Sequence, residues 1–492
     1  MMFFKLKSLI FTCVLILQLN SSYGQSYDIN LLNEISTTSN TADKPQSKIW
    51  KYDGYWWSVF PDVTGTHVWK LNSVGTWVNV FTISTEISTN SDCKQSGDKA
   101  FILLFNGANS ELINLQYNSL NSTYELLNVS IPSTNLSFNS STETVTLDID
   151  GENVMWLAYE QNGAIKVNSS LYPYTSWGNA STIETGVNND DICSIKALPG
   201  KIAVFWSNSV LKEFGCKFHN NGDIQSNWSI KEQPGFNQSQ PNLGGGLADD
   251  HINLASTSHG DLYCAIKTDY DNDDNTYPQI GLFKRNFNGV WDDLYYIDSS
   301  GTRPIIIIDE INDVLQVIYT DWIIENGNIN ASGDILFKES SLTNISFGVR
   351  NTLIQSNDYN NTYIKYNNVS STKDNYDCET VVLASSQSAP FTTVGVKLVC
   401  KTINILENNT NSQVEVFPNP FNSSCKVLFN NTKNDAYQFS VYDLNGRIVQ
   451  TYYSTSEHIE ILKGNLKNGM YFYRLQNLKT KHVESNGKIV IE

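Results

Sequence analysis

The chain has 492 residues, of which 40% are hydrophobic and 12% aromatic, and this length predicts two or three domains. Its 50 acidic and 33 basic side chains give a net charge of −17, which argues against nucleic acid as a partner. The eight cysteines are scattered without Cys-x-x-Cys spacing, so we expect neither a zinc site nor a dense disulfide scaffold. Most of them should be buried, and the sequence does not show which two would form a disulfide.

The first 24 residues have the three-part pattern of a secretory signal peptide. Lys5 and Lys7 give a positive start, Leu9–Leu17 is apolar, and a polar stretch leads to cleavage near Gly24. The apolar run is too short to span a bilayer comfortably, and no other long apolar segment follows. The sequence therefore predicts export, with no stable membrane insertion.

Residues 25–405 have the pattern of an all-β domain built from a degenerate repeat. Short alternating runs are separated by Asn, Gly, Asp and Ser, and the clearest unit covers Lys48–Phe81. The other units are centred on Lys94–Phe105, Thr144–Tyr159, Ile192–Trp206, Ile252–Thr268, Pro304–Thr320 and Thr372–Ser385. Seven units of about fifty residues predict a seven-bladed β-propeller, whereas two β-sandwiches, the alternative, would not produce this spacing.

In a propeller the innermost strands begin at one end of the central channel, so polar residues before them should converge. Basic residues are scarce, and four of them are predicted to begin innermost strands and to form an anion-binding funnel together with Asp250. They are Lys48, Lys94, Arg303 and Lys373. The alternative is that these side chains merely cap solvated strand ends.

His251 is the predicted catalytic residue, because it directly follows Asp249 and Asp250. A neighbouring carboxylate orients an imidazole and raises its basicity, which suits general acid–base catalysis. The alternative is an ordinary surface histidine. No metal ligands are predicted, and the sequence does not identify a cofactor. Three tyrosines are either further proton donors or core residues: Tyr263, Tyr319 and Tyr376.

Several segments of the repeat region resemble a group of secreted bacterial propellers that accompany polysaccharide utilisation. They are Lys44–Lys48, Asp249–Leu254, Leu262–Lys267, Arg303–Ile306, Ile335–Ser340, Asn344–Phe347 and Ser371–Asp374. More distantly, the architecture is similar to that of seven-bladed polysaccharide lyases, including ulvan lyases. In those lyases His and Tyr transfer protons and basic residues bind the uronate; His251 fits the His role, and no Tyr matches.

The resemblance implies a carbon–oxygen lyase, either a polysaccharide lyase or an oligosaccharide dehydratase. It would act by β-elimination on an acidic polysaccharide or oligosaccharide that contains uronic acid, such as ulvan. Two alternatives stay open. One is a propeller that binds a glycan without chemistry, and the other is a glycoside hydrolase on the same fold.

The C-terminal part reads as a separate domain, residues 414–492, after a polar linker at 406–413. Four segments resemble the C-terminal sorting domain of the type IX secretion system: Val416–Phe421, Val441–Arg447, Leu466–Tyr473 and Lys488–Glu492. This resemblance implies a small β-sandwich that is recognised by the secretion machinery. The protein would then be secreted through the periplasm to the cell surface or the medium.

Overall fold

The computed structural model describes residues 27–41, 44–270, 276–325, 328–330, 332–359, 362–400, 414–443, 448–480 and 483–492. They form two compact units, one ending at Cys400 and one beginning after it. Almost all regular structure is β-strand, apart from the 3₁₀ turns η1 (Gly107–Asn109) and η2 (Phe236–Gln238). No helix of the described residues is long and apolar enough to cross a membrane. The predicted signal peptide and linker lie outside the described residues.

The first unit contains seven successive sheets, numbered here one to seven. Sheet one is β3 (Ile49–Tyr52), β4 (Tyr55–Asp62), β5 (Gly65–Leu71) and β6 (Trp77–Ser84). Sheet two is β7 (Asn90–Ser96), β8 (Lys99–Phe105), β9 (Ser110–Asn118), β10 (Thr123–Leu126) and β11 (Ser133–Leu136). Sheet three is β12 (Val145–Ile149), β13 (Val154–Glu160), β14 (Ala164–Leu171) and β15 (Ser181–Thr185). Sheet four is β16 (Cys193–Leu198), β17 (Lys201–Asn208) and β18 (Glu213–Asn220).

Sheet five is β19 (Ile252–Ser256), β20 (Leu262–Lys267), β21 (Ile280–Arg285) and β22 (Tyr295–Asp298). Sheet six is β23 (Thr302–Asp309), β24 (Val314–Thr320), β27 (Ile335–Ser341) and β28 (Asn351–Ile354). Sheet seven is β31 (Tyr366–Ser370), β32 (Glu379–Ser386) and β33 (Phe391–Cys400), joined by β1 (Tyr27–Leu31) and β2 (Ile35–Thr37). Two short hairpins complete the unit: β25 (Ile323–Glu325) with β26 (Asn328–Asn330), and β29 (Asn357–Tyr359) with β30 (Thr362–Ile364).

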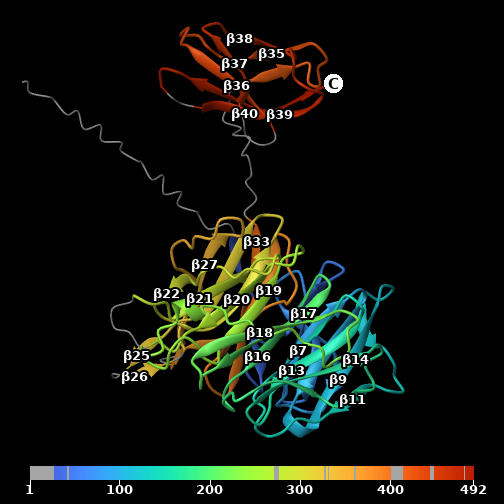
Figure 1. The fold of residues 1–492 in the computed structure, drawn as a ribbon. Helices are drawn as coiled ribbons and strands as arrows, with labels where there is room; N and C mark the ends of the chain where they lie inside the picture. Colours follow the sequence, from blue (N-terminus) through green and yellow to red (C-terminus); the bar gives the residue numbers. More distant parts are fainter. Residues whose placement is uncertain are drawn as a thin grey trace, which may run out of the picture. The chain divides into compact units, whose positions relative to one another are not determined.

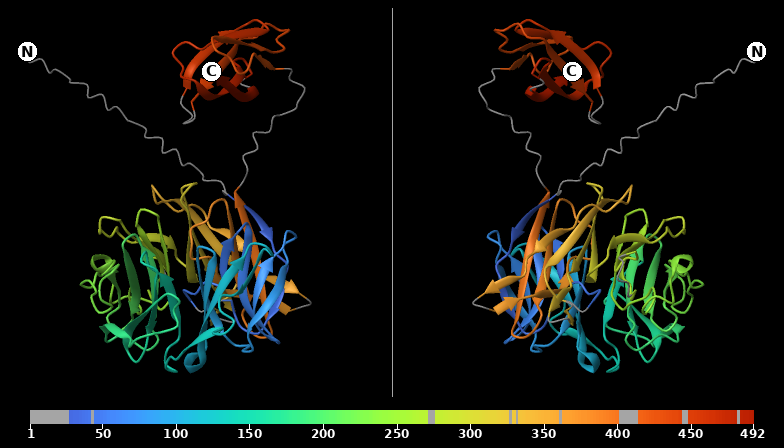
Figure 2. Two further views of the ribbon diagram at one scale, coloured as in Figure 1. Left: turned by 90° about the vertical axis from the view of Figure 1, so that its right-hand side faces the viewer. Right: turned by 90° about the vertical axis from the view of Figure 1, so that its left-hand side faces the viewer.

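Neighbouring strands within each sheet are antiparallel, and several of them are joined by tight turns. The turn between β3 and β4 shows why, because Asp53 and Gly54 both have positive φ, as a two-residue type I′ hairpin requires. The Asp-Gly pair thus joins two adjacent strands of the Lys48–Phe81 unit. In most of the sheets, strands that follow one another in the chain are also neighbours (Figures 1 and 2).

The seven sheets form a closed ring, a β-propeller, and the predicted fold class is confirmed. Each sheet shares a hydrophobic cluster with the next one, from sheets one and two through to sheets six and seven. The last cluster closes the ring, because Trp56 and Phe60 of sheet one pack with Val381 and Leu383 of sheet seven. The cores are therefore between the sheets, and the polar ends of the innermost strands are left to line the axis.

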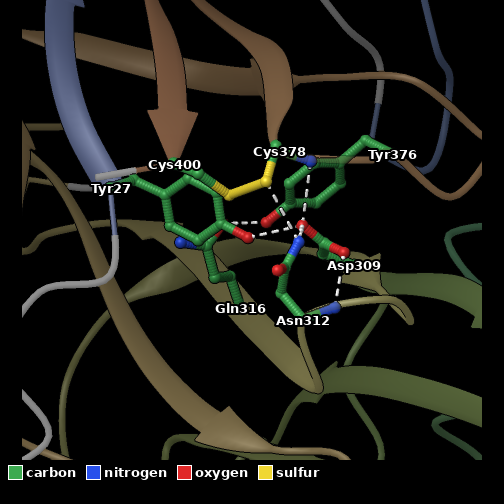
Figure 3. The surroundings of a disulfide bond; sticks show 7 residues. All are labelled: Tyr27, Asp309, Asn312, Gln316, Tyr376, Cys378 and Cys400. Carbon is green, nitrogen blue, oxygen red and sulfur yellow. Dashed lines mark hydrogen bonds between the residues drawn. A yellow bond between two sulfur atoms is a disulfide. The ribbon is translucent and has the colours of Figure 1, made fainter. Parts of the chain in front are cut away.

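The N-terminal strands complete sheet seven, which the sequence did not predict. β1 pairs with β33 along its length, and β2 pairs with the other end of β33. Figure 3 shows how the Tyr27 hydroxyl donates to Asp309 Oδ2 at 2.7 Å and so ties β1 to sheet six. The first strands of this unit, β1 and β2, and its last strand, β33, thus lie in one sheet, which closes the ring.

A disulfide between Cys378 and Cys400 lies beside this closure (Figure 3). It links the segment before β32 to the last residue of β33. Asp309 also accepts from the backbone amide of Cys378 at 3.0 Å, so the same carboxylate holds both segments. The five other described cysteines are free and buried, as predicted for most of them.

The second unit has two sheets around one core. One is β34 (Glu415–Phe417), β35 (Ser424–Leu428) and β38 (His458–Leu462). The other is β37 (Ile448–Ser454), β36 (Tyr437–Tyr442), β39 (Gly469–Asn477) and β40 (Val483–Ile491). Residues of both sheets share a hydrophobic cluster that contains Val427, Phe439 and Ile489, which makes this unit the predicted β-sandwich.

Candidate functional site

Polar residues that precede several innermost strands meet at one end of the propeller, called the mouth here. Glu143 precedes β12, Asp190 precedes β16, and Asp249, Asp250 and His251 directly precede β19. Lys44 lies a few residues before β3, and Lys267 ends β20 opposite the start of β19. Together these seven residues form the mouth cluster.

His251 is the centre of the mouth cluster. Its Nδ1 lies 2.6 Å from Asp249 Oδ1 and 2.7 Å from Asp250 Oδ1, and its side chain is largely buried. Burial opposes the charged ring, but the hydrogen bonds and charges of the two aspartates outweigh it and raise the pKa of His251 above 6.5. Nε2 is buried and has no hydrogen-bond partner in the described structure, so this nitrogen is available for another group.

Two lysines balance the acidic groups around His251. Lys44 Nζ lies 2.8 Å from Glu143 and also pairs with Asp250, while Lys267 Nζ pairs with Asp249. Burial alone would lower the pKa of Lys44, but Asp250 and Glu143 raise it, so this lysine stays charged. The mouth cluster is a connected chain of ion pairs that fixes the orientation of the imidazole.

Three carboxylates of the cluster are close enough to hold a divalent cation. One oxygen each of Glu143, Asp190 and Asp250 lie within 4.8 Å of one another. The ammonium of Lys44 already neutralises two of these groups, so a metal ion would have to displace it. The residues around the mouth therefore fit proton transfer better than metal binding.

Glu160 ends β13 at the same end of sheet three, and the sequence did not single it out. It is almost fully buried, and its Oε1 accepts one bond from the backbone amide of Gly163, whereas Oε2 has no partner among the described residues. Burial raises the pKa of Glu160 from 4.5 to about 7, and the charges of Asp191 and Glu143 add to this effect. A carboxyl group whose pKa is about 7 thus lies close to the mouth.

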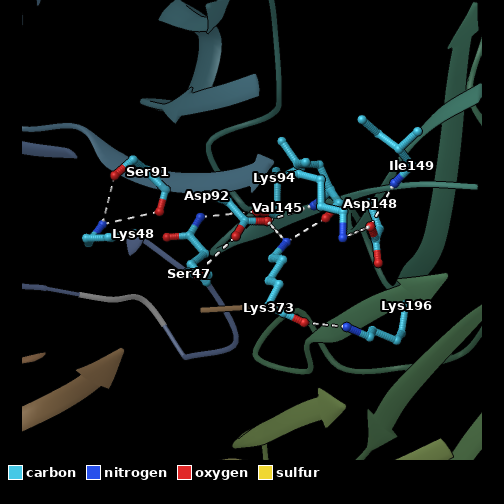
Figure 4. A network of polar contacts seen from close by, with 12 residues as sticks. Ser47, Lys48, Ser91, Asp92, Lys94, Val145, Asp148, Ile149, Lys196 and Lys373 are labelled. Carbon is cyan, nitrogen blue, oxygen red and sulfur yellow. Dashed lines mark hydrogen bonds and ion pairs between the residues drawn. The ribbon is translucent and has the colours of Figure 1, made fainter. Parts of the chain in front are cut away.

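Two of the predicted funnel lysines, Lys94 and Lys373, belong to a second group of charged residues, which we call the axial cluster (Figure 4). Lys94 Nζ lies 3.4 Å from Asp148 and 2.6 Å from Asp374. Lys373 Nζ pairs with Asp92 and donates to the carbonyl oxygen of Leu147 at 2.5 Å. The axial cluster comprises Asp92, Lys94, Asp148, Lys196, Lys373 and Asp374.

The two buried aspartates of the axial cluster connect neighbouring sheets. Asp92 accepts from the backbone amides of Ser47 in the segment before sheet one and Leu147 of sheet three, both at 2.8 Å. Asp148 accepts from the amides of Ile149 and of Ala197 in sheet four, also at 2.8 Å. Burial would raise the pKa of Asp148, but the charges of Lys94, Lys196 and Lys373 lower it to about 2. The contacts of these two carboxylates thus stabilise the fold.

The predicted binding residues therefore do not form one ring at the mouth. Lys48 precedes β3 as expected, but it is buried and donates to Ser91 at 3.3 Å. The expected positions of Lys94 and Lys373 were wrong, because Lys94 lies within β7 and Lys373 follows β31. Arg303 is the second residue of β23, half-buried and with positive φ. Only Asp250 and His251 of the predicted set lie in contact, and the binding roles of the others stay predictions.

The three candidate tyrosines lie in the cores between sheets. Tyr263 and Tyr319 belong to the cluster between sheets five and six, and Tyr376 to that between sheets six and seven. The Tyr376 hydroxyl donates to Gln316 and the Tyr319 hydroxyl to Asp298. Burial raises the pKa of all three. Their contacts favour the core alternative.

The axis itself has little free space. A cavity of about 20 Å³ lies between Gln46, Lys196, Asn253 and Lys373, which is room for about one water molecule. This cavity is too small for a sugar ring, so a glycan could enter it only if the axial side chains moved.

Comparison with known proteins identifies the C-terminal unit. Residues 415–492 match the family model of the secretion system C-terminal sorting domain. The chain is thus a β-propeller protein that carries a sorting domain. It is handled by the type IX secretion machinery and exported to the cell surface or the extracellular space. No curated protein matches the chain in sequence.

Several solved structures are similar to the chain. PorZ, an essential bacterial surface component of the type IX secretion system of Porphyromonas gingivalis, has a TM-score of 0.38 and 10% identity, covering 92% of this chain and 60% of PorZ. A Lactobacillus plantarum protein has a TM-score of 0.42 and 10% identity over 65% of this chain and 85% of its own. The Dos1 propeller has a TM-score of 0.40 and 10% identity over 71% and 77%. The chain spans less than two thirds of PorZ, and the propeller assignment rests on the sheet topology above.

Proposed function

We propose that the protein is a secreted carbohydrate-active enzyme whose reaction centre is the mouth cluster. One observation carries the proposal: Asp249 and Asp250 bind Nδ1 of His251, while Nε2 has no partner in the described structure. A carboxylate-oriented imidazole with one nitrogen available is an arrangement that general acid–base catalysis uses. The two aspartates raise the pKa of His251 and so favour the protonated ring, which suits His251 to donate a proton rather than to remove one.

The specific reaction that we propose is β-elimination on a glycan that contains uronic acid. A carboxylate of the mouth cluster, Glu143 or Asp190, takes the proton from C5 of the uronate. The electrons of the C5–H bond form a C4=C5 double bond, and the C4–O bond breaks. His251 donates its proton to the departing oxygen at C4. Neutralising the substrate carboxylate lowers the barrier to the first step, and Arg303 is the basic residue proposed for this contact.

If the departing oxygen belongs to a second sugar, the enzyme is a polysaccharide lyase. If it is a terminal hydroxyl, water leaves and the enzyme is an oligosaccharide dehydratase. In both cases the substrate is an acidic poly- or oligosaccharide such as ulvan.

Glycoside hydrolysis is a second candidate, because carboxylate oxygens of Glu143, Asp190 and Asp250 lie within 4.8 Å of one another. Retaining glycosidases use two carboxyl groups about 5 Å apart, one as nucleophile and one as acid. The mouth cluster therefore contains a carboxylate pair of suitable spacing in addition to His251.

Incubation of the purified protein with ulvan and with ulvan oligosaccharides tests these reactions. Elimination creates a conjugated double bond that absorbs in the ultraviolet, whereas hydrolysis creates new reducing ends without this absorbance. We expect ultraviolet absorbance that is lost in His251→Ala; absorbance without new reducing ends would indicate the dehydratase. New reducing ends alone would favour hydrolysis. Binding of the glycan with neither product would contradict the enzyme proposal and leave a binding propeller.

A further inference from the structure

A groove lies at the opposite end of the propeller from the mouth cluster, between sheets three and four. β12 runs away from the mouth, so the turn that follows it and the loops after β14 and β18 lie at this other end (Figure 1). These segments line a groove of about 810 Å³, which is within the size range of small-molecule sites in proteins. The groove is separate from the proposed reaction centre.

The walls of the groove are held in place by buried anchors. On the side of sheet three, Tyr174 is buried, packs edge-on against Phe101 and donates its hydroxyl to the carbonyl of Asn153 at 3.1 Å. Ser170 Oγ donates to the carbonyl of Ser176 at 2.7 Å and closes the loop after β14. The anchored loop leaves the neighbouring Tyr172 exposed at the rim, where its ring lines the groove.

Gln225 lies in the loop after β18 of sheet four and joins the two walls of the groove. Its Oε1 accepts from Ser169 Oγ at 2.9 Å, and its Nε2 donates to the carbonyl of Asn179 at 3.0 Å. The contacts run from one sheet to the other, so the groove is formed before any ligand binds. Preorganisation of this kind reduces the entropy cost of binding.

The floor of the groove contains Trp156 and His219, whose ring centres are 4.5 Å apart. His219 Nε2 lies 3.0 Å from the carbonyl oxygen of Ile224, which can only accept, so Nε2 carries the hydrogen. Nδ1 is left as an acceptor that has no partner in the described structure, although the residue is only 1% exposed. A buried acceptor without a donor is costly, and a ligand or a water bound there would supply one.

The charges of the groove exclude an acidic ligand. None of the residues that line it is Lys or Arg, and three are acidic. Both oxygens of Asp150 accept hydrogen bonds from its own turn and from Trp156 Nε1, and Asp223 accepts from Asn227 Nδ2 at 2.9 Å. Glu152 is exposed, and its carboxylate has no partner within the described part of the chain. A single carboxylate without a partner does not select a polycation. It can, however, accept hydrogen bonds from the hydroxyl groups of a ligand.

We infer that this groove binds a neutral glycan. A sugar ring presents an apolar C–H face that can lie on the exposed ring of Tyr172, and hydroxyls that can donate to Glu152 and towards His219 Nδ1. The side chains of Ser169, Ser170, Thr175 and Ser176 add hydroxyl groups along the walls. The inference does not depend on the reaction proposed at the mouth.

Binding of cellohexaose, mannohexaose and laminarihexaose to the full chain tests the inference, by calorimetry or saturation-transfer NMR. We expect at least one of them to bind, with affinity lowered roughly tenfold or more in Tyr172→Ala and severalfold in Glu152→Gln. Tyr296→Ala removes a comparably exposed tyrosine from sheet five and should leave the affinity unchanged. His251→Ala should also bind normally, which separates this groove from the mouth.

Glu152→Gln keeps the size of the side chain, so it reports on the groove even if Tyr172→Ala folds poorly; melting temperatures identify that case. The inference is wrong if none of the three hexasaccharides binds at millimolar concentration. It is also wrong if the binding is insensitive to both groove variants, or if only an oligogalacturonate or tetralysine binds there.

Discussion

Two buried carboxyl groups of sheet three, Asp148 in the axial cluster and Glu160 near the mouth, have opposite properties. Asp148 accepts two backbone hydrogen bonds and pairs with Lys94, and its pKa is lowered to about 2. The side chain of Glu160 accepts a hydrogen bond from the amide of Gly163, its Oε2 is unpaired in the described structure, and its pKa is raised to about 7. The positive charges and hydrogen-bond donors around a buried carboxyl group decide whether it is ionised or protonated.

The same contrast separates the two clusters as a whole. Acids and lysines of the axial cluster are bound to each other and to backbone groups of neighbouring sheets, so their role is to hold the ring together. The mouth cluster also pairs acids with lysines, but it contains a histidine as well, and Nε2 of His251 has no partner in the described structure. Convergence of polar residues on a propeller axis is therefore not enough to define a site; unsatisfied polar atoms are the better guide.

The largest effect on stability is expected from Asp148→Ala. The change leaves Lys94 and the amide of Ala197 without their buried partner, and breaking a buried ion pair costs about 3–5 kcal/mol. Urea denaturation of the propeller should show this loss of the free energy of unfolding. Asp190→Ala at the mouth, where the side chain is exposed, should cost less than about 0.5 kcal/mol. Equal losses in both variants would remove the distinction between the clusters.

The next largest effect is expected on catalysis, from His251→Ala. Loss of a general acid should lower turnover on ulvan roughly a hundredfold or more, measured per folded molecule. His259→Ala is the matched control, because His259 is an exposed histidine on the turn after β19, away from the mouth. A His251→Ala protein that melts normally and keeps the parental rate would take this residue out of the mechanism.

Glu160→Gln should increase stability at alkaline pH. The folded-state pKa is raised from 4.5 to about 7, so the protonated form is favoured and stability falls as the pH rises through this range. Glutamine is neutral at every pH and avoids this loss, so the variant should exceed the parent by roughly 2 kcal/mol at pH 8 and match it near pH 4. Denaturation at both pH values checks this. A parent whose stability does not fall between them would show that Glu160 is solvated or paired.

The smallest effect is expected from the basic residues of the predicted funnel. Arg303→Ala should weaken binding of ulvan oligosaccharides severalfold to tenfold at low salt without unfolding the protein. The sequence predicts the same for Lys373→Ala. The structure adds a loss of stability to that variant, because Lys373 pairs with the buried Asp92. Unchanged affinity in both variants would end the funnel hypothesis.

The sequence predicted the fold well because the determinants of a blade are local. Turns such as Asp53–Gly54 and the recurring strand pattern are visible in each unit by itself. The closure was not predicted, since β1 and β33 are far apart in sequence and β1 has no repeat signature. Cys378 and Cys400 pair across the β32–β33 hairpin, whose register the sequence does not show.

The candidate site was predicted where its residues are consecutive, as in Asp249, Asp250 and His251. Lys267 was missed because it reaches the cluster only through the register of β20 against β19. The sequence predicted Lys94 and Lys373 at the starts of strands. Pairing with neighbouring strands instead puts Lys94 within β7 and Lys373 after the end of β31. Glu160 carries no sequence signal, because its pKa depends on burial beneath neighbouring residues.

The central claim is that Asp249 and Asp250 hold a protonated imidazole at the mouth. NMR titration of the His251 ring nitrogens, assigned by comparison with His251→Ala, measures this directly. We expect a pKa above 6.5 that falls in Asp249→Asn and Asp250→Asn. A pKa at or below 6.5 that does not respond to either substitution would contradict the proposed reaction centre.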